Sequence, residues 1–205
     1  IRLIDMGVPY VLVGAENHVL HNYHVIMDNY RAVGQLMDRL AELGHRRVCM
    51  INGLNAQYDM LERLRGFNDG VWRHHMVSES RWNTFGEQTV EGGYERMKMV
   101  LEEAEPEQRP TAVVCGNDYI AAGALQAIRE AGLRVPEDVS VTGYDDITLT
   151  SILQPALTTV HLPAFDLGLQ GAEMMQRRLN QQCRESEAIT LSCEAIFRSS
   201  IGKAK

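Results

Sequence analysis

The sequence predicts an α/β protein in which parallel strands alternate with helices. Two observations support this class. Short apolar runs rich in valine recur along the chain, and most are followed by a longer segment with apolar residues at helical spacing. Strands that alternate with helices of this length form right-handed βαβ units, which build a parallel sheet covered by helices.

The clearest unit spans residues 111–146, TAVVCGNDYIAAGALQAIREAGLRVPEDVSVTGYDD. Thr111–Cys115 has the composition of a strand buried on both faces. Asn117 and Asp118 come next and can cap the helix that follows, which ends at a glycine. Val139–Thr142 is the second strand, and Gly-Tyr-Asp-Asp follows it directly.

The other elements are predicted in the same way, from apolar runs for strands and from apolar residues three or four positions apart for helices. The further predicted strands are Pro9–Val13, Arg47–Ile51, Val77–Trp82, Leu157–His161 and Ala195–Arg198. The further predicted helices cover residues 28–43, 59–71, 89–104 and 165–180.

Composition places the chain among ordinary globular proteins and excludes several classes. It has 205 residues, 45% of them hydrophobic and 23% charged, with a net charge of −7 at pH 7. Without a basic block, this segment is not expected to hold nucleic acid itself. The cysteines at 49, 115, 183 and 193 lack the spacing of a zinc or redox site, which favours a reduced, cytoplasmic setting. No apolar run approaches the roughly 18 residues of a membrane span.

The segment GNDYIAAGALQAIREAGLRVPEDVSVTGYDD resembles the effector-binding core of the lactose/galactose repressor (LacI/GalR) family of bacterial transcription regulators. Four shorter pieces follow in the family's order with nearly the family's spacing: LGHRRV at 43–48, RLRGF at 63–67, GY at 93–94 and LTTV at 157–160. The resemblance covers almost the whole chain, and VPEDVSV-x-G-Y-D-D is its most specific part.

This resemblance implies a two-lobe, periplasmic-binding-protein-like fold whose first lobe is only partly present. On that plan, residues 1–27 and 162–191 are the remnant of the N-terminal lobe, and residues 28–161 and 192–205 form the C-terminal lobe. Ile1–Gly7 looks like the last turn of a helix, as if earlier βα units had been cut away. The family's DNA-binding head would precede them and is absent from this chain.

Polar residues follow the two strands of the 111–146 unit, where ligands bind in open parallel sheets. Asn117, Asp118, Asp145 and Asp146 are therefore expected side by side. The resemblance implies that Asp145 accepts hydrogen bonds from an effector, a task that suits a carboxylate because it offers about four acceptor sites. The alternative is an aspartate that caps a turn, and Asp146 is expected to cap or brace.

Three positions, Arg63, Asn117 and Gln88, match effector-contacting positions of the family. Arg63 could fork two oxygens of a sugar or acid, or it could be an exposed arginine paired with Glu62 or Asp59. Asn117 is expected to contact ligand while Asp118 caps the helix, although capping by Asn117 alone would also explain it. Gln88 stands where many relatives carry an aromatic residue that stacks on the ligand. Phe85 or Trp82 could supply that face instead, or both could be packing residues.

No metal, cofactor or catalytic site is expected. His18, His21 and His24 are three positions apart, a spacing that needs a helix to bring them together, and their segment reads as a loop. His161 could face the ligand cleft. The chain has no nucleophile elbow, no Walker-type phosphate loop and no dinucleotide-binding glycine pattern, so an enzyme is disfavoured.

The resemblance implies the effector-sensing and dimerisation core of a DNA-binding transcription regulator that acts as a repressor. The effector would be a sugar, a sugar acid or a similar polar metabolite, bound in the cleft between the lobes. The expected partners are that effector, a second copy of the chain and operator DNA, the last through the N-terminal domain outside this chain. The alternative is a periplasmic-type sugar-binding protein of a transporter, which shares the fold.

Overall fold

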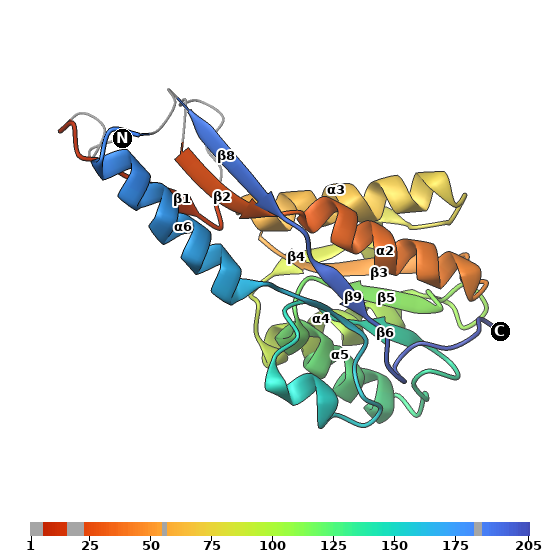
Figure 1. The fold of residues 1–205 in the computed structure, drawn as a ribbon. Helices are drawn as coiled ribbons and strands as arrows, with labels where there is room; N and C mark the ends of the chain where they lie inside the picture. Colours follow the sequence, from red (N-terminus) through yellow and green to blue (C-terminus); the bar gives the residue numbers. More distant parts are fainter. Residues whose placement is uncertain (1–5, 16–22, 55–56, 183–185) are drawn as a thin grey trace. The chain divides into compact units, whose positions relative to one another are not determined.

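The computed structural model divides the chain into two compact units. One consists of Ile1–Asp28 and Leu162–Cys193, and the other of Asn29–His161 and Glu194–Lys205. Figure 1 shows the elements of both units along the sequence. The structure describes residues 6–15, 23–54, 57–182 and 186–205.

The larger unit is built on a four-stranded sheet in which every neighbouring pair of strands is parallel. The strand order is β4-β3-β5-β6, so the chain starts in the middle of the sheet and moves out to both edges. The strands are β3 (Val48–Gly53), β4 (Thr84–Gly86), β5 (Ala112–Cys115) and β6 (Ser140–Thr142). Every residue of β3 and β5 is buried, which confirms the valine-rich runs as strands covered on both faces.

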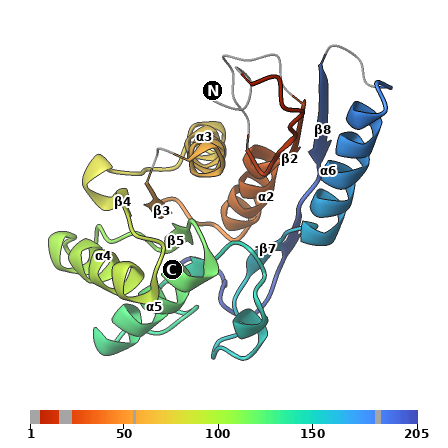
Figure 2. The same cartoon turned by 90° about the vertical axis from the view of Figure 1, so that its left-hand side faces the viewer.

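Helices cover both faces of this sheet, two on each side (Figure 2). One pair is α2 (Asn29–Glu42) with α3 (Tyr58–Arg73), and the other is α4 (Val90–Glu103) with α5 (Asp118–Glu130). A Cβ added to Gly123 of α5 would lie 2.0 Å from the Val90 carbonyl oxygen. The second pair can therefore approach so closely only because glycine stands at the crossing.

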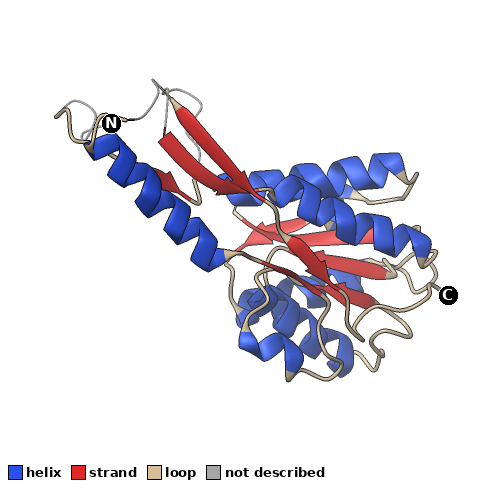
Figure 3. Ribbon diagram, viewed as in Figure 1, coloured by secondary structure: helices blue, strands red, loops and turns tan. Residues whose placement is uncertain are grey.

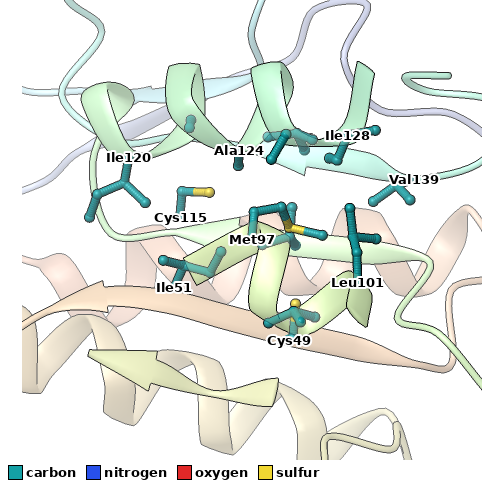
Figure 4. Close-up of a cluster of buried hydrophobic side chains, with 14 of the residues drawn as sticks. Cys49, Ile51, Met97, Leu101, Cys115, Ile120, Ala124, Ile128 and Val139 are labelled. Atoms are coloured by element: carbon teal, nitrogen blue, oxygen red, sulfur yellow. The ribbon is translucent and has the colours of Figure 1, made fainter. Parts of the chain in front are cut away.

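One hydrophobic core cluster of the larger unit lies between the sheet and the α4–α5 pair. Met97 and Leu101 of α4 and Ile120 and Ile128 of α5 point into it, as Figure 4 shows. Cys49 also lies in this cluster, where burial raises the pKa of its thiol. The cysteine is thus an inert core residue, as its place in an apolar run indicated.

Two short elements extend the larger unit beyond its sheet. Strand β7 (Thr159–His161) pairs antiparallel with β9 (Glu194–Ile196), which brings the last part of the chain back to this unit. A 3₁₀ turn, η2 (Thr148–Ser151), follows the Gly-Tyr-Asp-Asp segment.

The smaller unit has a three-stranded parallel sheet with the order β1-β2-β8, shown with its helix in Figure 3. Its strands are β1 (Leu12–Val13), β2 (Tyr23–Met27) and β8 (Glu187–Leu191), and helix α6 (Ala164–Leu179) packs against β1 and β2. None of the helices in the described part of the chain is long and apolar enough to cross a membrane.

The predicted elements hold except in three places. The strand predicted at Val77–Trp82 is wrong, because Val77 forms only an isolated bridge with Arg47 and Ser80–Trp82 is a 3₁₀ turn, η1. Strands β2, β4 and β8 were not predicted, since none of them is a long apolar run. The helix end expected at the start of the chain falls mostly on residues 1–5, which lie outside the described residues.

Candidate functional site

The carboxyl ends of β5 and β6 place the predicted site residues of the larger unit at one edge of its sheet. Gly116 and Asn117 come directly after β5. Tyr144 and Asp145 come after β6, separated from it by Gly143. Because β5 and β6 are adjacent and parallel, their ends lie at the same edge.

Arg63 of α3 reaches this edge and is buried there, with its side chain only 4% exposed. Its Nε donates to the Asn29 side-chain oxygen at 2.9 Å, and its Nη1 donates to the Gly116 carbonyl oxygen. Its Nη2 lies 3.5 Å from Asp145 Oδ1, and its guanidinium stacks on the Tyr144 ring at 3.6 Å. The alternative of an exposed Arg63 paired with a helix neighbour is therefore wrong.

Arg65, two residues along α3, takes the surface role instead. Its side chain is 68% exposed and its Nη1 lies 2.6 Å from Glu62 Oε1. The two arginines of the RLRGF segment thus point to opposite sides of the helix, one to the sheet edge and one to solvent.

Asp145 combines partial burial with an unusual backbone. Its φ is 109°, a conformation that side-chain-bearing residues rarely adopt, and the next residue, Asp146, has φ 53°. Such backbone costs about 1–3 kcal/mol per residue and is found preferentially at functional sites. Burial raises the pKa of the Asp145 carboxyl, the Arg63 charge opposes this rise, and Asp59 adds to it.

Asn117, and not Asp118, caps helix α5, which was the alternative considered for Asn117. Asn117 has extended backbone just before α5, and its side-chain oxygen accepts from Ile120 N at 2.8 Å, so it is the helix cap. Asp118 is the first residue of α5 and is not the cap. Its carboxylate is buried and accepts from Thr159 Oγ1 at 2.6 Å and from Ile147 N at 3.0 Å. Burial raises the pKa of Asp118 to about 6.

Asp146 braces the loop that carries Asp145, as the sequence suggested. Arg198 Nη2 donates to its carboxylate at 2.7 Å, and the His161 ring lies 3.0 Å from it. Burial alone would raise the pKa of Asp146, but the hydrogen bonds from Arg198 and His161 outweigh burial and hold it below its usual value. His161 is thus engaged with Asp146.

Trp82, Phe85 and Gln88, the three residues considered for contact with the face of a ligand, differ in how deeply they are buried. Trp82 is fully buried in the core, so it cannot supply a stacking face. Phe85 lies on edge strand β4 and is 39% exposed. Gln88 donates to the Gln57 side chain at 2.8 Å, and its amide packs over Gly53 at the end of β3.

Several residues that build this edge could not be identified from the sequence. Asn29 and the Gly116 carbonyl hold Arg63, Thr159 binds Asp118, and Gln57 pairs with Gln88. These contacts join residues 31 to 53 positions apart, so no local pattern reveals them.

The group that this edge offers to a ligand is a hydrogen-bond acceptor. Asp145 is a partly exposed carboxylate, whereas the Arg63 guanidinium is already engaged by Asn29, Gly116 and Asp145. A ligand with hydroxyl or amino groups can donate to such a carboxylate. Among the described residues there is no group of three metal-ligating side chains, and His18 and His21 lie outside them.

Comparison with known proteins assigns the chain to a family. Residues 37–201 match the family of periplasmic binding protein-like domains. The chain therefore belongs to the periplasmic binding protein-like domain family.

Its relatives are regulators of the LacI type, which confirms the resemblance to the LacI/GalR effector-binding core. The chain is 33% identical over 181 residues to the HTH-type transcriptional repressor PurR of Histophilus somni, covering 88% of this chain and 54% of that protein. It is 37% identical over 177 residues to PurR of Salmonella newport, with 86% and 51% covered. The chain thus spans about half the length of the curated relatives it matches.

Solved structures agree with this assignment. A LacI-family regulatory protein of Chloroflexus aggregans superimposes with a TM-score of 0.91 at 28% identity, over 99% of this chain and 72% of that one. A complex of the transcriptional regulator CelR with cellobiose gives a TM-score of 0.90 at 31% identity, over 97% and 60%. A LacI-family regulator of Enterococcus faecium with bound ribose gives 0.85 at 25% identity, over 99% and 74%.

Proposed function

We propose that this chain is the effector-sensing and dimerisation core of a bacterial DNA-binding transcription regulator, acting as a repressor. The observation that carries the proposal is the strand-end edge of the larger unit, where a partly exposed carboxylate, Asp145, is held by buried Arg63 in a chain whose relatives are named as repressors. Operator DNA would be read by a domain outside this chain, which itself carries a net charge of −7.

The proposed effector is a neutral sugar or a similar polar metabolite rich in hydroxyl groups. Related regulators are recorded with cellobiose and with ribose, and the acceptor character of Asp145 suits such donors. A sugar acid fits less well, because the Arg63 guanidinium that would bind its carboxylate already has three partners and a ring beneath it.

Four residues are proposed to act on the effector directly: Asp145, Asn117, Gln88 through its amide and Phe85 through its ring. Asn117 would contribute an amide N–H group, since its oxygen accepts from Ile120 in the helix cap and its Nδ2 already donates to the Gln88 carbonyl oxygen at 3.5 Å. Arg63 would fix the orientation of Asp145. Its Nη2 is the one nitrogen of the guanidinium that would contact the effector, because Nε and Nη1 are bonded to Asn29 and Gly116. Effector binding would act by favouring one arrangement of the protein over another, and only to the extent that its affinities for the two differ.

Thermal unfolding against a panel of neutral sugars, sugar acids, phosphosugars and purines tests this proposal. A ligand at 100 times its dissociation constant stabilises the folded state by about 2.7 kcal/mol. For a chain of this size that corresponds to a rise in Tm of roughly 5–10 °C. The expected result is a rise with one chemical class, lost in Asp145→Asn and retained in Glu107→Gln, which changes an exposed carboxylate.

The other outcomes are informative too. A rise that survives Asp145→Asn would keep the sensor function and reject the site. A rise in Tm with sugar acids alone would contradict the claim that the Arg63 guanidinium is already occupied by its protein partners. The regulator itself is tested by operator binding of the full-length protein with and without the active compound. An effect of that compound on DNA affinity supports a regulator, and the absence of an effect supports a transport protein.

We also propose that the protein works as a homodimer in the cytoplasm and is not an enzyme, in line with its relatives.

A further inference from the structure

We infer that Asp118 is a positioning residue that holds the Asp145–Asp146 turn in the shape needed to present Asp145 to the effector. This inference rests on the proposed function of Asp145. It assigns to Asp118 a role different from the helix cap predicted from the sequence.

The turn cannot hold its own shape by backbone preference. Asp145 and Asp146 have φ values of 109° and 53°, and neither residue is glycine. Residues remain in such conformations only where surrounding contacts determine them. A turn of this kind relaxes when those contacts are removed, and the direction of the Asp145 side chain changes with it.

Asp118 supplies contacts on the C-terminal side of the turn. Its Oδ2 accepts the Ile147 N–H at 3.0 Å. Its Oδ1 accepts the Thr159 hydroxyl at 2.6 Å, and the same hydroxyl oxygen accepts the Asp146 N–H at 3.3 Å. One buried carboxylate therefore fixes two successive amides of the turn, one directly and one through Thr159.

The approach of Asp118 to the turn is also close on the N-terminal side. A Cβ added to Gly143 would lie 2.2 Å from Asp118 Oδ1, so any larger residue there would displace the carboxylate. The Asp145 amide is held separately, by donation to the Val160 carbonyl oxygen at 3.0 Å. That bond provides an internal reference, since it does not involve Asp118.

The carboxylate is kept at an electrostatic cost, which argues for a role beyond stability. It is buried, and it lies near Asp145 and Asp146, both of which raise its pKa. Compensation comes from two hydrogen bonds and from the N-terminus of α5, where negative charge is favoured. A neutral asparagine would avoid the burial of charge, but its NH2 group would replace one of the two carboxylate oxygens, and an NH2 group donates and cannot accept the hydrogen bond made there.

Charged groups on every neighbouring element bear on how the turn titrates. Arg63 of α3 faces Asp145, with Asp59 behind it, and Arg198 and His161 face Asp146. The pKa of Asp118 is about 6, so this carboxylate gains its proton near pH 6. An aspartate with an ordinary pKa of about 3.9 is still ionised at that pH. His161 is hydrogen-bonded to Asp146 in the turn itself, so a variant without its imidazole serves as a control.

Amide hydrogen exchange in the full protein, followed by NMR, tests the inference without any ligand. In Asp118→Asn the Ile147 amide is expected to exchange about tenfold faster, the effect of losing one hydrogen bond of about 1.4 kcal/mol. Thr159→Val should speed exchange of the Asp146 amide, and Thr159→Ser should restore it. The Asp145 amide should be unchanged, as should all three in Glu91→Gln, which removes an exposed first-turn carboxylate from α4.

A pH series separates positioning from a merely structural role. The Ile147 amide shift should titrate near pH 6 in the wild type and in His161→Asn, but not in Asp118→Asn. Unchanged exchange of Asp146 and Ile147 in Asp118→Asn would overturn the inference. So would equally faster exchange throughout the larger unit, because that reports lost stability.

Calorimetry with D-ribose and cellobiose then links the turn to binding. If either sugar binds, Asp118→Asn should weaken it about tenfold while Glu91→Gln does not, and unchanged affinity would overturn the inference. If neither sugar binds but the exchange results hold, the positioning of the turn stands, and it is the proposed sugar effector that fails.

Discussion

The Arg63 guanidinium lies between Asp145 and Tyr144, 3.5 Å from the carboxylate oxygen of the one and 3.6 Å from the ring centre of the other. Both partners belong to the Gly-Tyr-Asp-Asp segment that follows β6, whereas Arg63 comes from α3. This contact therefore ties a helix on one face of the sheet to the loop that carries the proposed effector carboxylate.

Arg63→Lys is expected to destabilise the protein by about 3 kcal/mol, because a buried charged network loses its partners. A lysine ammonium cannot reach Asn29, the Gly116 carbonyl and Asp145 together, and it cannot stack flat on Tyr144. The measurement is the free energy of unfolding in urea. Arg65→Lys is the matched control, expected to change this free energy by less than about 0.5 kcal/mol because its ion pair is exposed. Similar losses in both variants would contradict the division of roles between the two arginines.

The α4–α5 crossing gives a second prediction. Gly123→Ala would place a methyl group 2.0 Å from the Val90 carbonyl oxygen and 2.5 Å from Tyr94 N. Since these are backbone atoms, the helices must move apart, and we expect a loss of about 2–3 kcal/mol in the free energy of unfolding.

Gly168→Ala in α6 is the control for that substitution. Nothing lies within 4 Å of the added Cβ, and the residue is inside a helix. Alanine should therefore stabilise the helix by roughly 0.5–1 kcal/mol. A stable Gly123→Ala variant would show that the helix pair is less tightly packed than its glycines indicate.

His45 gives a prediction about pH. Its ring is buried between the Thr111 hydroxyl at 2.9 Å and the Gly202 carbonyl oxygen at 3.0 Å, and burial lowers its pKa. The carbonyl can only accept, so Nε2 carries the proton. With a folded pKa below the unfolded value of about 6.5, the unfolded chain binds the extra proton, and stability falls as pH drops below that value.

His45→Gln should remove that slope. Urea unfolding of both proteins between pH 7.5 and pH 5 should show the wild type losing on the order of 1 kcal/mol more than the variant. Asp118 acts in the opposite direction, because its raised pKa favours the folded state as pH falls toward about 4. It is present in both proteins, so only the difference between them reports on His45. Parallel curves would exclude His45 as the source.

The sequence predicted the alternation of strands and helices because each buried strand of the larger unit is a short valine-rich run and each helix has an apolar face. Thr111–Cys115 and Val139–Thr142 illustrate this, since both differ from the observed strands by one residue at the start. Strand β8, in contrast, has alternating half-buried and exposed residues, so its composition carries little signal.

The place of a candidate site residue in the fold could be predicted from the sequence only where its position relative to a strand end was enough. Asp145 lies at the sheet edge because parallel strands end together, and this follows from the order of elements. The burial of Arg63 and the capping role of Asn117 depend on contacts with residues far away or on one backbone angle. Neither is encoded in local composition, which is why Asp118 was expected to cap and Arg63 could have been a surface residue.

Recognition of the effector by Gln88 or by Phe85 can be distinguished with two substitutions. Gln88→Leu removes the amide and its hydrogen bond to Gln57, whereas Phe85→Leu removes the ring and keeps an apolar side chain. Both residues are partly exposed, so each change should cost less than about 1 kcal/mol of stability. With the compound that raises Tm most, calorimetry should show an affinity about tenfold weaker for Gln88→Leu, because a lost hydrogen bond to a ligand hydroxyl is worth about that factor. A loss confined to Phe85→Leu would instead mean that the sugar stacks on the β4 ring, and that the glutamine in the usual aromatic position has no part in binding.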